Sequence, residues 1–190
     1  MPYRETTERL AGYRREIAAL REKMRALQQN VEPEEVADYE FAGPAGPVQL
    51  SQLFGDKDTL FVIHNMGKSC PNCTMWADGF NGVLPHLESR AAFVVTSPDD
   101  PATQADFVAS RGWKFRMVSH RSTTFAADMG YRGEGGGWLP GVSVFKRIDG
   151  KITRVSDAGF EPGDDFCAVW HLFQLIPEGT AGWRAKFSYA

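Results

Sequence analysis

The sequence has few cysteines, little net charge and no long apolar run, and each shortage excludes a class of protein. Three cysteines among 190 residues are too few and too odd in number for a disulfide-stabilised scaffold. The 21 basic and 24 acidic residues give a net charge of −3, which disfavours nucleic acid or a membrane surface as a partner. No apolar run approaches the roughly 20 residues of a membrane span, and residues 1–10 alternate charges where a signal peptide is apolar. We therefore expect a cytoplasmic protein.

The length and composition are those of one domain with an appendage. Hydrophobic residues make up 43% of the chain, enough to build a single core without disulfides or metal. We predict an amphipathic helix in residues 1–30, followed in residues 31–190 by one compact domain that includes a C-terminal tail.

The N-terminal segment has the spacing of a coiled-coil-like helix. Between Arg4 and Gln29, apolar residues recur in steps of three and four, which places them on one narrow stripe: Leu10, Tyr13, Ile17, Leu20, Met24 and Leu27. The segment carries seven basic and four acidic residues. Two interpretations remain open, namely an arm that forms a homodimer and a helix that covers its own domain.

Strands and helices alternate in the first part of the domain, and a hairpin closes it. Alternation implies parallel strands with crossover helices, whereas Asp149-Gly150 is a strong signal for an antiparallel hairpin. The predicted strands are Tyr39–Phe41, Thr59–Met66, Ala91–Ser97, Val142–Ile148 and Ile152–Ser156, and the predicted helices after Cys73 begin at Thr74, Pro101 (to Ser110) and Asp164 (to Leu175). Together these elements predict a mixed sheet with flanking helices.

The motif Cys70-Pro71-Asn72-Cys73 lies between a predicted strand and a predicted helix. Unsatisfied N–H groups and the positive dipole at a helix N-terminus stabilise a thiolate, so Cys70 is the candidate nucleophile. Two intervening residues allow Cys73 to reach a mixed disulfide at Cys70 and resolve it. Pro71 stiffens the turn between the two cysteines. The motif therefore predicts a redox-active dithiol.

Two other interpretations compete with the dithiol. Cys70 and Cys73 have ligand types that combine with Cys167 and His171 to form a four-ligand zinc site. Alternatively, they are unrelated structural thiols. The distance along the chain to Cys167 disfavours zinc, and we expect Cys167 to be a buried small hydrophobe.

Three further residues are candidates for supporting the site. His64, on the strand before Cys70, is placed to face the disulfide and to accept or relay a proton. Asp78 is placed to do the same if it is buried. For both residues, the alternative is a satisfied polar side chain that takes no part in catalysis. Pro140 precedes the first hairpin strand, where a cis peptide would hold substrate backbone beside the sulfurs and a trans proline would form an ordinary turn.

The order strand, Cys-x-x-Cys, helix, βα, proline, hairpin, helix resembles the thioredoxin fold over residues 39–176. More specifically, the chain resembles a bacterial thioredoxin-like family of predicted dithiol-disulfide oxidoreductases, a domain of unknown function related to the thioredoxin/peroxiredoxin superfamily. The matching segments are Asp38–Phe41, Leu50–Gly55, Cys70–Gly82, Arg111–Phe115, Gly141–Phe145 and Pro177–Gly179. The resemblance implies a three-layer α/β sandwich after a long N-terminal helix, a redox activity, and a position for His64 near the site.

We therefore predict a thiol-disulfide oxidoreductase that uses Cys70 and Cys73, with neither metal nor cofactor. Its partners would be protein or small-molecule disulfides and thiols. A peroxiredoxin-like peroxidase is the second candidate, although a Thr and Pro set ahead of Cys70 is missing. A non-catalytic dimeric scaffold that senses oxidation is the third.

Overall fold

The computed structural model describes residues 2–189. The chain consists of two compact units, Met1–Pro33 and Glu34–Ala190. The first unit contains helix α1 (Tyr3–Gln29), which confirms the helix predicted from the apolar spacing. Within residues 2–189, no helix combines the length and the apolar character needed to cross a membrane.

Helix α1 keeps its apolar stripe exposed. None of its described residues is buried, and the stripe ranges from 44% exposure at Leu10 to 77% at Leu27. The ion pair between Arg4 and Glu8, at 3.2 Å, is one turn apart on the helix surface, where such pairs add little stability. The predicted packing of this stripe on another surface therefore stays a prediction.

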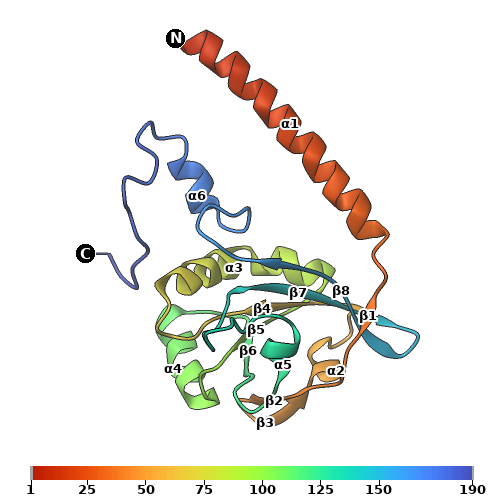
Figure 1. Cartoon of the computed structure of the whole chain (residues 1–190). Coiled ribbons are helices and arrows are strands. Elements are labelled where there is room, and N and C mark those ends of the chain that lie inside the picture. Colours follow the sequence, from red (N-terminus) through yellow and green to blue (C-terminus); the bar gives the residue numbers. More distant parts are fainter. Residues whose placement is uncertain (1, 190) are drawn as a thin grey trace. The chain divides into compact units, whose positions relative to one another are not determined.

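The second unit is built on one eight-stranded mixed sheet (Figure 1). Its strand order is β1-β8-β7-β4-β5-β6-β2-β3. The central strands β4, β5 and β6 are parallel, and β7 and β8 form the predicted antiparallel hairpin beside β4. The bounds are β1 (Glu34–Glu35), β2 (Glu40–Gly43), β3 (Gly46–Gln49), β4 (Thr59–His64), β5 (Ala92–Ser97), β6 (Arg116–Ser119), β7 (Gly141–Ile148) and β8 (Lys151–Gly159).

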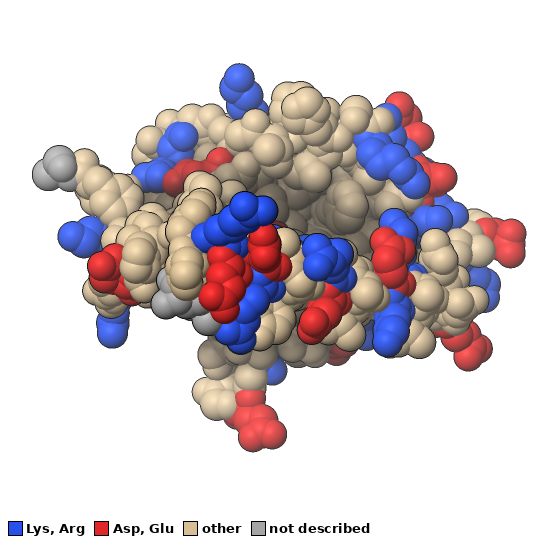
Figure 2. Space-filling model, turned by 90° about the horizontal axis from the view of Figure 1, so that it is seen from above, with Lys and Arg blue, Asp and Glu red and all other residues tan. Residues whose placement is uncertain are grey.

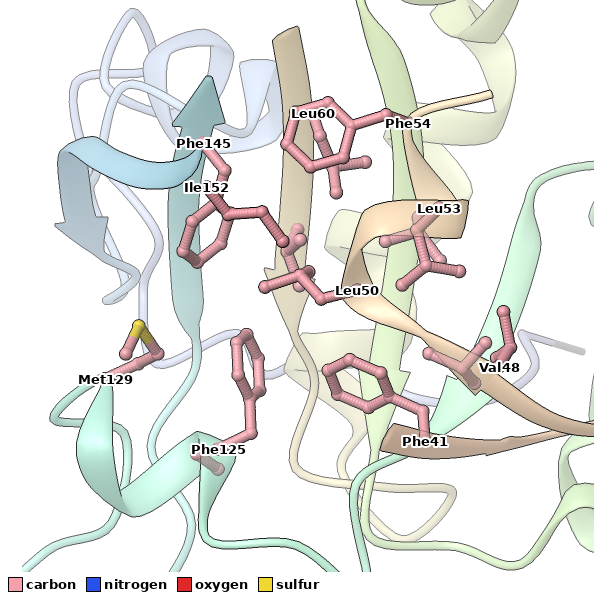
Figure 3. Close-up of a cluster of buried hydrophobic side chains, with 14 of the residues drawn as sticks. Phe41, Val48, Leu50, Leu53, Phe54, Leu60, Phe125, Met129, Phe145 and Ile152 are labelled. Carbon is pink, nitrogen blue, oxygen red and sulfur yellow. The ribbon is translucent and has the colours of Figure 1, made fainter. Parts of the chain in front are cut away.

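Helices cover both faces of this sheet and complete the predicted three-layer sandwich. Side chains from α2 (Leu50–Leu53) and α5 (Phe125–Asp128) pack on one face in a cluster that includes Phe41, Phe54 and Phe145 (Figure 3). On the other face, α3 (Pro71–Arg90) and α4 (Pro101–Arg111) pack against Ile63 and Val95 together with the C-terminal segment. Alternation along each strand divides the side chains between these two layers.

The helix and turn boundaries follow from local chemistry. Helix α4 begins where the Asp100 side chain accepts a hydrogen bond from the Thr103 N–H, and it ends at Gly112 in the left-handed conformation. The hairpin turns at Asp149 and Gly150, which both have positive φ, as its type requires.

The predicted last helix, Asp164–Leu175, is wrong at its start, because α6 covers only Ala168–Phe173. The Asp164 carboxylate accepts hydrogen bonds from the N–H groups of Glu161 and Phe166, and such side-chain bonds favour a turn over a helix. The short elements β1, β3, β6, α2 and α5 were not assigned from the sequence.

On the face of the molecule in Figure 2, basic and acidic side chains are interspersed.

Candidate functional site

Cys70 and Cys73 lie together at the N-terminus of α3, directly after the loop that follows β4. Cys70 is the N-cap residue, and its Sγ accepts a hydrogen bond from the Cys73 N–H at 3.1 Å. Pro71 occupies the first turn of the helix, where no intrahelical partner is lost. Cys70 is half-buried, whereas Cys73 is only 3% exposed. The two sulfurs, both thiols here, therefore differ in access to solvent.

The two thiols also differ in acidity. A hydrogen bond from the Cys73 side chain lowers the pKa of Cys70 to about 7, helped by the backbone N–H groups of residues 72 and 73 and opposed by burial. The same hydrogen bond, burial and the charge on Cys70 raise the pKa of Cys73, although the Met66 N–H acts in the opposite direction. Near neutral pH, Cys70 is therefore substantially thiolate while Cys73 keeps its proton.

Two polar residues that the sequence did not single out hold the loop before Cys70. The Gly67 N–H donates to Asn65 Oδ1 and the Lys68 N–H donates to Asp99 Oδ2, both at 2.8 Å. Gly67 has φ of +101°, and a Cβ there would approach the Asp99 carboxylate to 3.0 Å. Asp99 follows β5, the parallel neighbour of β4. Its position at the carboxyl end of a parallel strand is the sequence feature that could have identified it as a residue near the site.

His64 lies near the cysteines but on the other face of the sheet. Its Nε2 is 2.9 Å from Ser143 Oγ, and its ring stacks on Tyr131 with centroids 3.7 Å apart. Burial holds the pKa of His64 well below its ordinary value, so the imidazole is neutral. It borders the same small cavity of about 10 Å³ as Cys73. The predicted proton relay is not supported, because strand alternation directs Ile63, and not His64, toward α3.

Asp78 has a structural position in place of the predicted proton-transfer role. Its carboxylate pairs with Arg111 and accepts a hydrogen bond from Trp113 Nε1 at 2.8 Å. These contacts tie α3 to the end of α4. Both carboxylate oxygens of Asp78 therefore bind partners other than the cysteines.

Pro140 borders the same small cavity as Cys73, as its predicted position opposite the active turn requires. Its peptide bond is trans, since no cis peptide occurs in the described chain. The Pro140 carbonyl accepts a hydrogen bond from the Phe160 N–H at 2.9 Å. The structure thus contains the ordinary trans proline and not the cis peptide.

The zinc site is not formed. Cys167 is 6% exposed in the hydrophobic cluster beside α3, which is the environment expected for it, and burial raises its pKa. His171 is exposed and lies 3.2 Å from Asp165. Among residues 2–189 no three His, Cys, Asp or Glu side chains gather as metal ligands would.

A cleft of about 630 Å³ opens beside Cys70. One wall is the start of α3, and the other is the segment from Pro162 to Ala185, which includes α6. Its lining residues are Cys70, Pro71, Asn72, Pro162, Gly163, Trp170, Gln174, Thr180, Trp183, Arg184 and Ala185. No local sequence pattern predicts this cleft, because its two walls are about 90 residues apart in the chain.

A family model described as "Bacterial protein of unknown function (DUF899)" matches residues 3–187. The chain belongs to DUF899. This match confirms the family resemblance seen in the motifs. No curated protein matches the sequence.

Several solved structures that resemble this DUF899 protein are peroxiredoxins. Peroxidoxin BcpB from Mycobacterium tuberculosis is 28% identical, with a TM-score of 0.55 over 67% of this chain and 84% of that one. Xanthomonas campestris peroxiredoxin Q is 19% identical, with a TM-score of 0.55 over 64% and 80%. A peroxiredoxin-like protein from Aquifex aeolicus is 17% identical, with a TM-score of 0.52 over 67% and 74%. The predicted thioredoxin-like fold is therefore confirmed, and its similarity to these redox proteins supports a redox function.

Proposed function

We propose that this DUF899 protein is a thiol-disulfide oxidoreductase in which Cys70 is the nucleophile and Cys73 the resolving thiol. The observation that carries the proposal is the asymmetry of the pair. Cys70 is the more exposed and more acidic sulfur, and Cys73 is buried with a raised pKa. Such an asymmetry is what a two-step exchange requires, because only the first sulfur must meet the substrate.

In the first step, the Cys70 thiolate attacks one sulfur of a substrate disulfide. A new bond forms between Cys70 and that sulfur, the substrate S–S bond breaks, and the second sulfur leaves as a thiolate. The N–H groups of residues 72 and 73 stabilise the attacking anion. The half-buried position of Cys70 gives the substrate access from the cleft.

In the second step, Cys73 attacks Cys70 within the mixed disulfide. Once Cys70 is covalently bound, it no longer holds the charge and hydrogen bond that raise the pKa of Cys73. The Cys73 proton passes to the thiolate released in the first step, and the Met66 N–H stabilises the anion that remains. Attack then forms the Cys70–Cys73 disulfide and releases the second substrate thiolate. Protein dithiol is oxidised and substrate disulfide is reduced; the reverse sequence oxidises a dithiol substrate.

Trapping the mixed disulfide tests the assignment. Cys73→Ser should accumulate a covalent adduct at Cys70 with 2-hydroxyethyl disulfide, visible by intact mass and peptide mapping. Cys167→Ser is the matched control and should complete the reaction as the unmodified chain does. An adduct on Cys73 in Cys70→Ser, formed as fast as the Cys70 adduct, would reverse the roles. No adduct in any variant would refute the function.

Thiol peroxidase activity is the second candidate, and the peroxiredoxin structures favour it. Here the Cys70 thiolate would attack a hydroperoxide, break the O–O bond and become a sulfenic acid with release of an alcohol or water. Cys73 would then displace water to form the same disulfide. The loop Met66-Gly67-Lys68-Ser69 lacks a threonine to polarise the peroxide. Peroxide consumption with dithiothreitol as donor, measured beside disulfide exchange, separates the two activities.

A further inference from the structure

We infer that the cleft beside Cys70 binds a small disulfide that carries a carboxylate, with Arg184 as the residue that recognises the carboxylate. This inference rests on the proposed exchange at Cys70 and specifies its substrate class. It uses residues of the C-terminal segment that neither the family match nor the cysteine motif assigns.

The size and position of the cleft suit a small molecule. Its volume of about 630 Å³ lies within the roughly 300–1,000 Å³ of ligand pockets. Cys70, Pro71 and Asn72 line it on one side, so a molecule bound there touches the thiolate-bearing turn. A protein disulfide requires only an accessible Cys70 sulfur, so a concavity of this volume beside Cys70 favours a small molecule.

The C-terminal wall is anchored to the rest of the domain. Trp183 packs edge-to-face on Phe173 at 4.9 Å and on Trp170 at 5.9 Å between centroids. The Phe187 carbonyl accepts a hydrogen bond from Arg111 on α4 at 2.6 Å. Ala185 is buried. The wall is therefore a packed part of the fold, which gives the cleft a defined shape.

One polar group in the wall, the indole N–H of Trp170, lacks a partner among the described residues. Trp170 is 5% exposed, and its buried Nε1 has no hydrogen-bond acceptor among the described residues. A buried donor without an acceptor is costly, and Trp170 is one of the residues that line the cleft. Gln174, Thr180 and Asn72 add amide and hydroxyl groups to the same lining.

Arg184 supplies the charge that selects the ligand. It is the one basic side chain among the described residues that line the cleft, and it forms no ion pair within residues 2–189. The pKa of Cys70 is lowered by Cys73 and backbone N–H groups, so forming the thiolate does not require this guanidinium. Its planar donors match a carboxylate. Tryptophan faces beside it suit the apolar part of a ligand.

The test compares three small disulfides on the reduced protein: oxidised glutathione with carboxylates, neutral 2-hydroxyethyl disulfide, and cationic cystamine. We expect the second-order rate constant for Cys70 to be highest with oxidised glutathione and lowest with cystamine. In Arg184→Gln, the ratio of glutathione to hydroxyethyl rate constants should fall about tenfold, as loss of one charge-assisted hydrogen bond predicts. Lys186→Gln removes the same charge outside the cleft lining and should keep the ratio.

The outcomes separate this inference from the function on which it rests. Equal rates with all three disulfides, or an unchanged ratio in Arg184→Gln, would overturn the carboxylate assignment while the exchange at Cys70 stands. An equal fall in Lys186→Gln would also overturn it, since the effect would then be a general charge effect. Failure of every disulfide to react would refute the proposed function itself.

Discussion

The two faces of the sheet differ in the charge state of the ionisable residue that each one holds. Strand β4 contributes His64 to one face and leads into the loop before Cys70 on the other. On the face with α2 and α5, His64 is enclosed by Phe125 and Tyr131, and burial lowers its pKa so that it stays uncharged. On the face with α3, hydrogen bonds to Cys70 lower its pKa so that it becomes charged. The same direction of shift thus removes a charge from the core and creates one at the cleft. The cause of a pKa shift, and not its direction, marks the reactive residue.

The largest expected effect is a loss of stability on the face with α2 and α5, while the face with α3 stays unchanged. Phe125 is fully buried against Tyr39, Phe41 and His64, so Phe125→Ala should lower the free energy of unfolding by about 3–5 kcal/mol. Urea denaturation measures the loss. Phe166→Ala, at a 40% exposed position, should cost clearly less. If Phe125→Ala changes the alkylation rate of Cys70 under native conditions, the two faces are not independent.

A substitution in the loop before Cys70 should have the next largest effect. Gly67→Ala places a Cβ at 3.0 Å from Asp99 with φ of +101°, which should cost about 1–3 kcal/mol of stability and slow disulfide exchange. Gly79→Ala is the matched control, because its Cβ meets nothing within 4 Å and alanine favours a helix by about 0.5–1 kcal/mol. Equal stability of the two variants would show that the loop is not constrained as described.

The pH dependence of the alkylation rate of Cys70 tests whether hydrogen bonding is the cause of its lowered pKa. Thiolate forms as pH rises through about 7, so the alkylation rate should fall about tenfold per pH unit below that value. Cys73→Ala removes the side-chain donor and should move this profile toward the higher pKa of an ordinary thiol. At pH 6, its rate should be about tenfold lower than that of the unmodified chain. Cys73→Ser retains a hydrogen-bond donor, so its pH profile should shift less. Equal shifts in the two variants would show that the Cys73 hydrogen bond does not cause the lowered pKa.

The smallest expected effect on the site comes from α1. We predict that its stripe forms a dimer, so Leu20→Glu should convert the full-length protein to a monomer in sedimentation while Cys70 reacts at an unchanged rate. Ala18→Glu adds the same charge beside the stripe and should keep the dimer. A full-length monomer at every concentration would contradict the dimer and favour the helix as a cover for its own domain.

Short-range patterns made part of this structure predictable. The three-and-four spacing identified α1, Asp149-Gly150 identified the hairpin, and the Cys-x-x-Cys motif between strand and helix located the dithiol. The environment of His64 could not be chosen from the sequence, because alternation shows that neighbours face opposite ways but not which layer each side chain meets. The cleft was missed because it joins Cys70 to Trp170 and Arg184 across the fold. The last helix begins later than predicted, because Asp164 accepts side-chain hydrogen bonds that periodicity does not report.

The aromatic wall of the cleft has an optical consequence. Trp183, which is partly exposed, and Trp170, which is 5% exposed, both line the space beside Cys70. A molecule entering there displaces solvent from an indole, so the intrinsic emission of the unlabelled protein should shift to shorter wavelength on binding. Trp183→Phe should remove most of that change. Occupancy is thus observable in the Cys70→Ser variant, where no bond is made or broken.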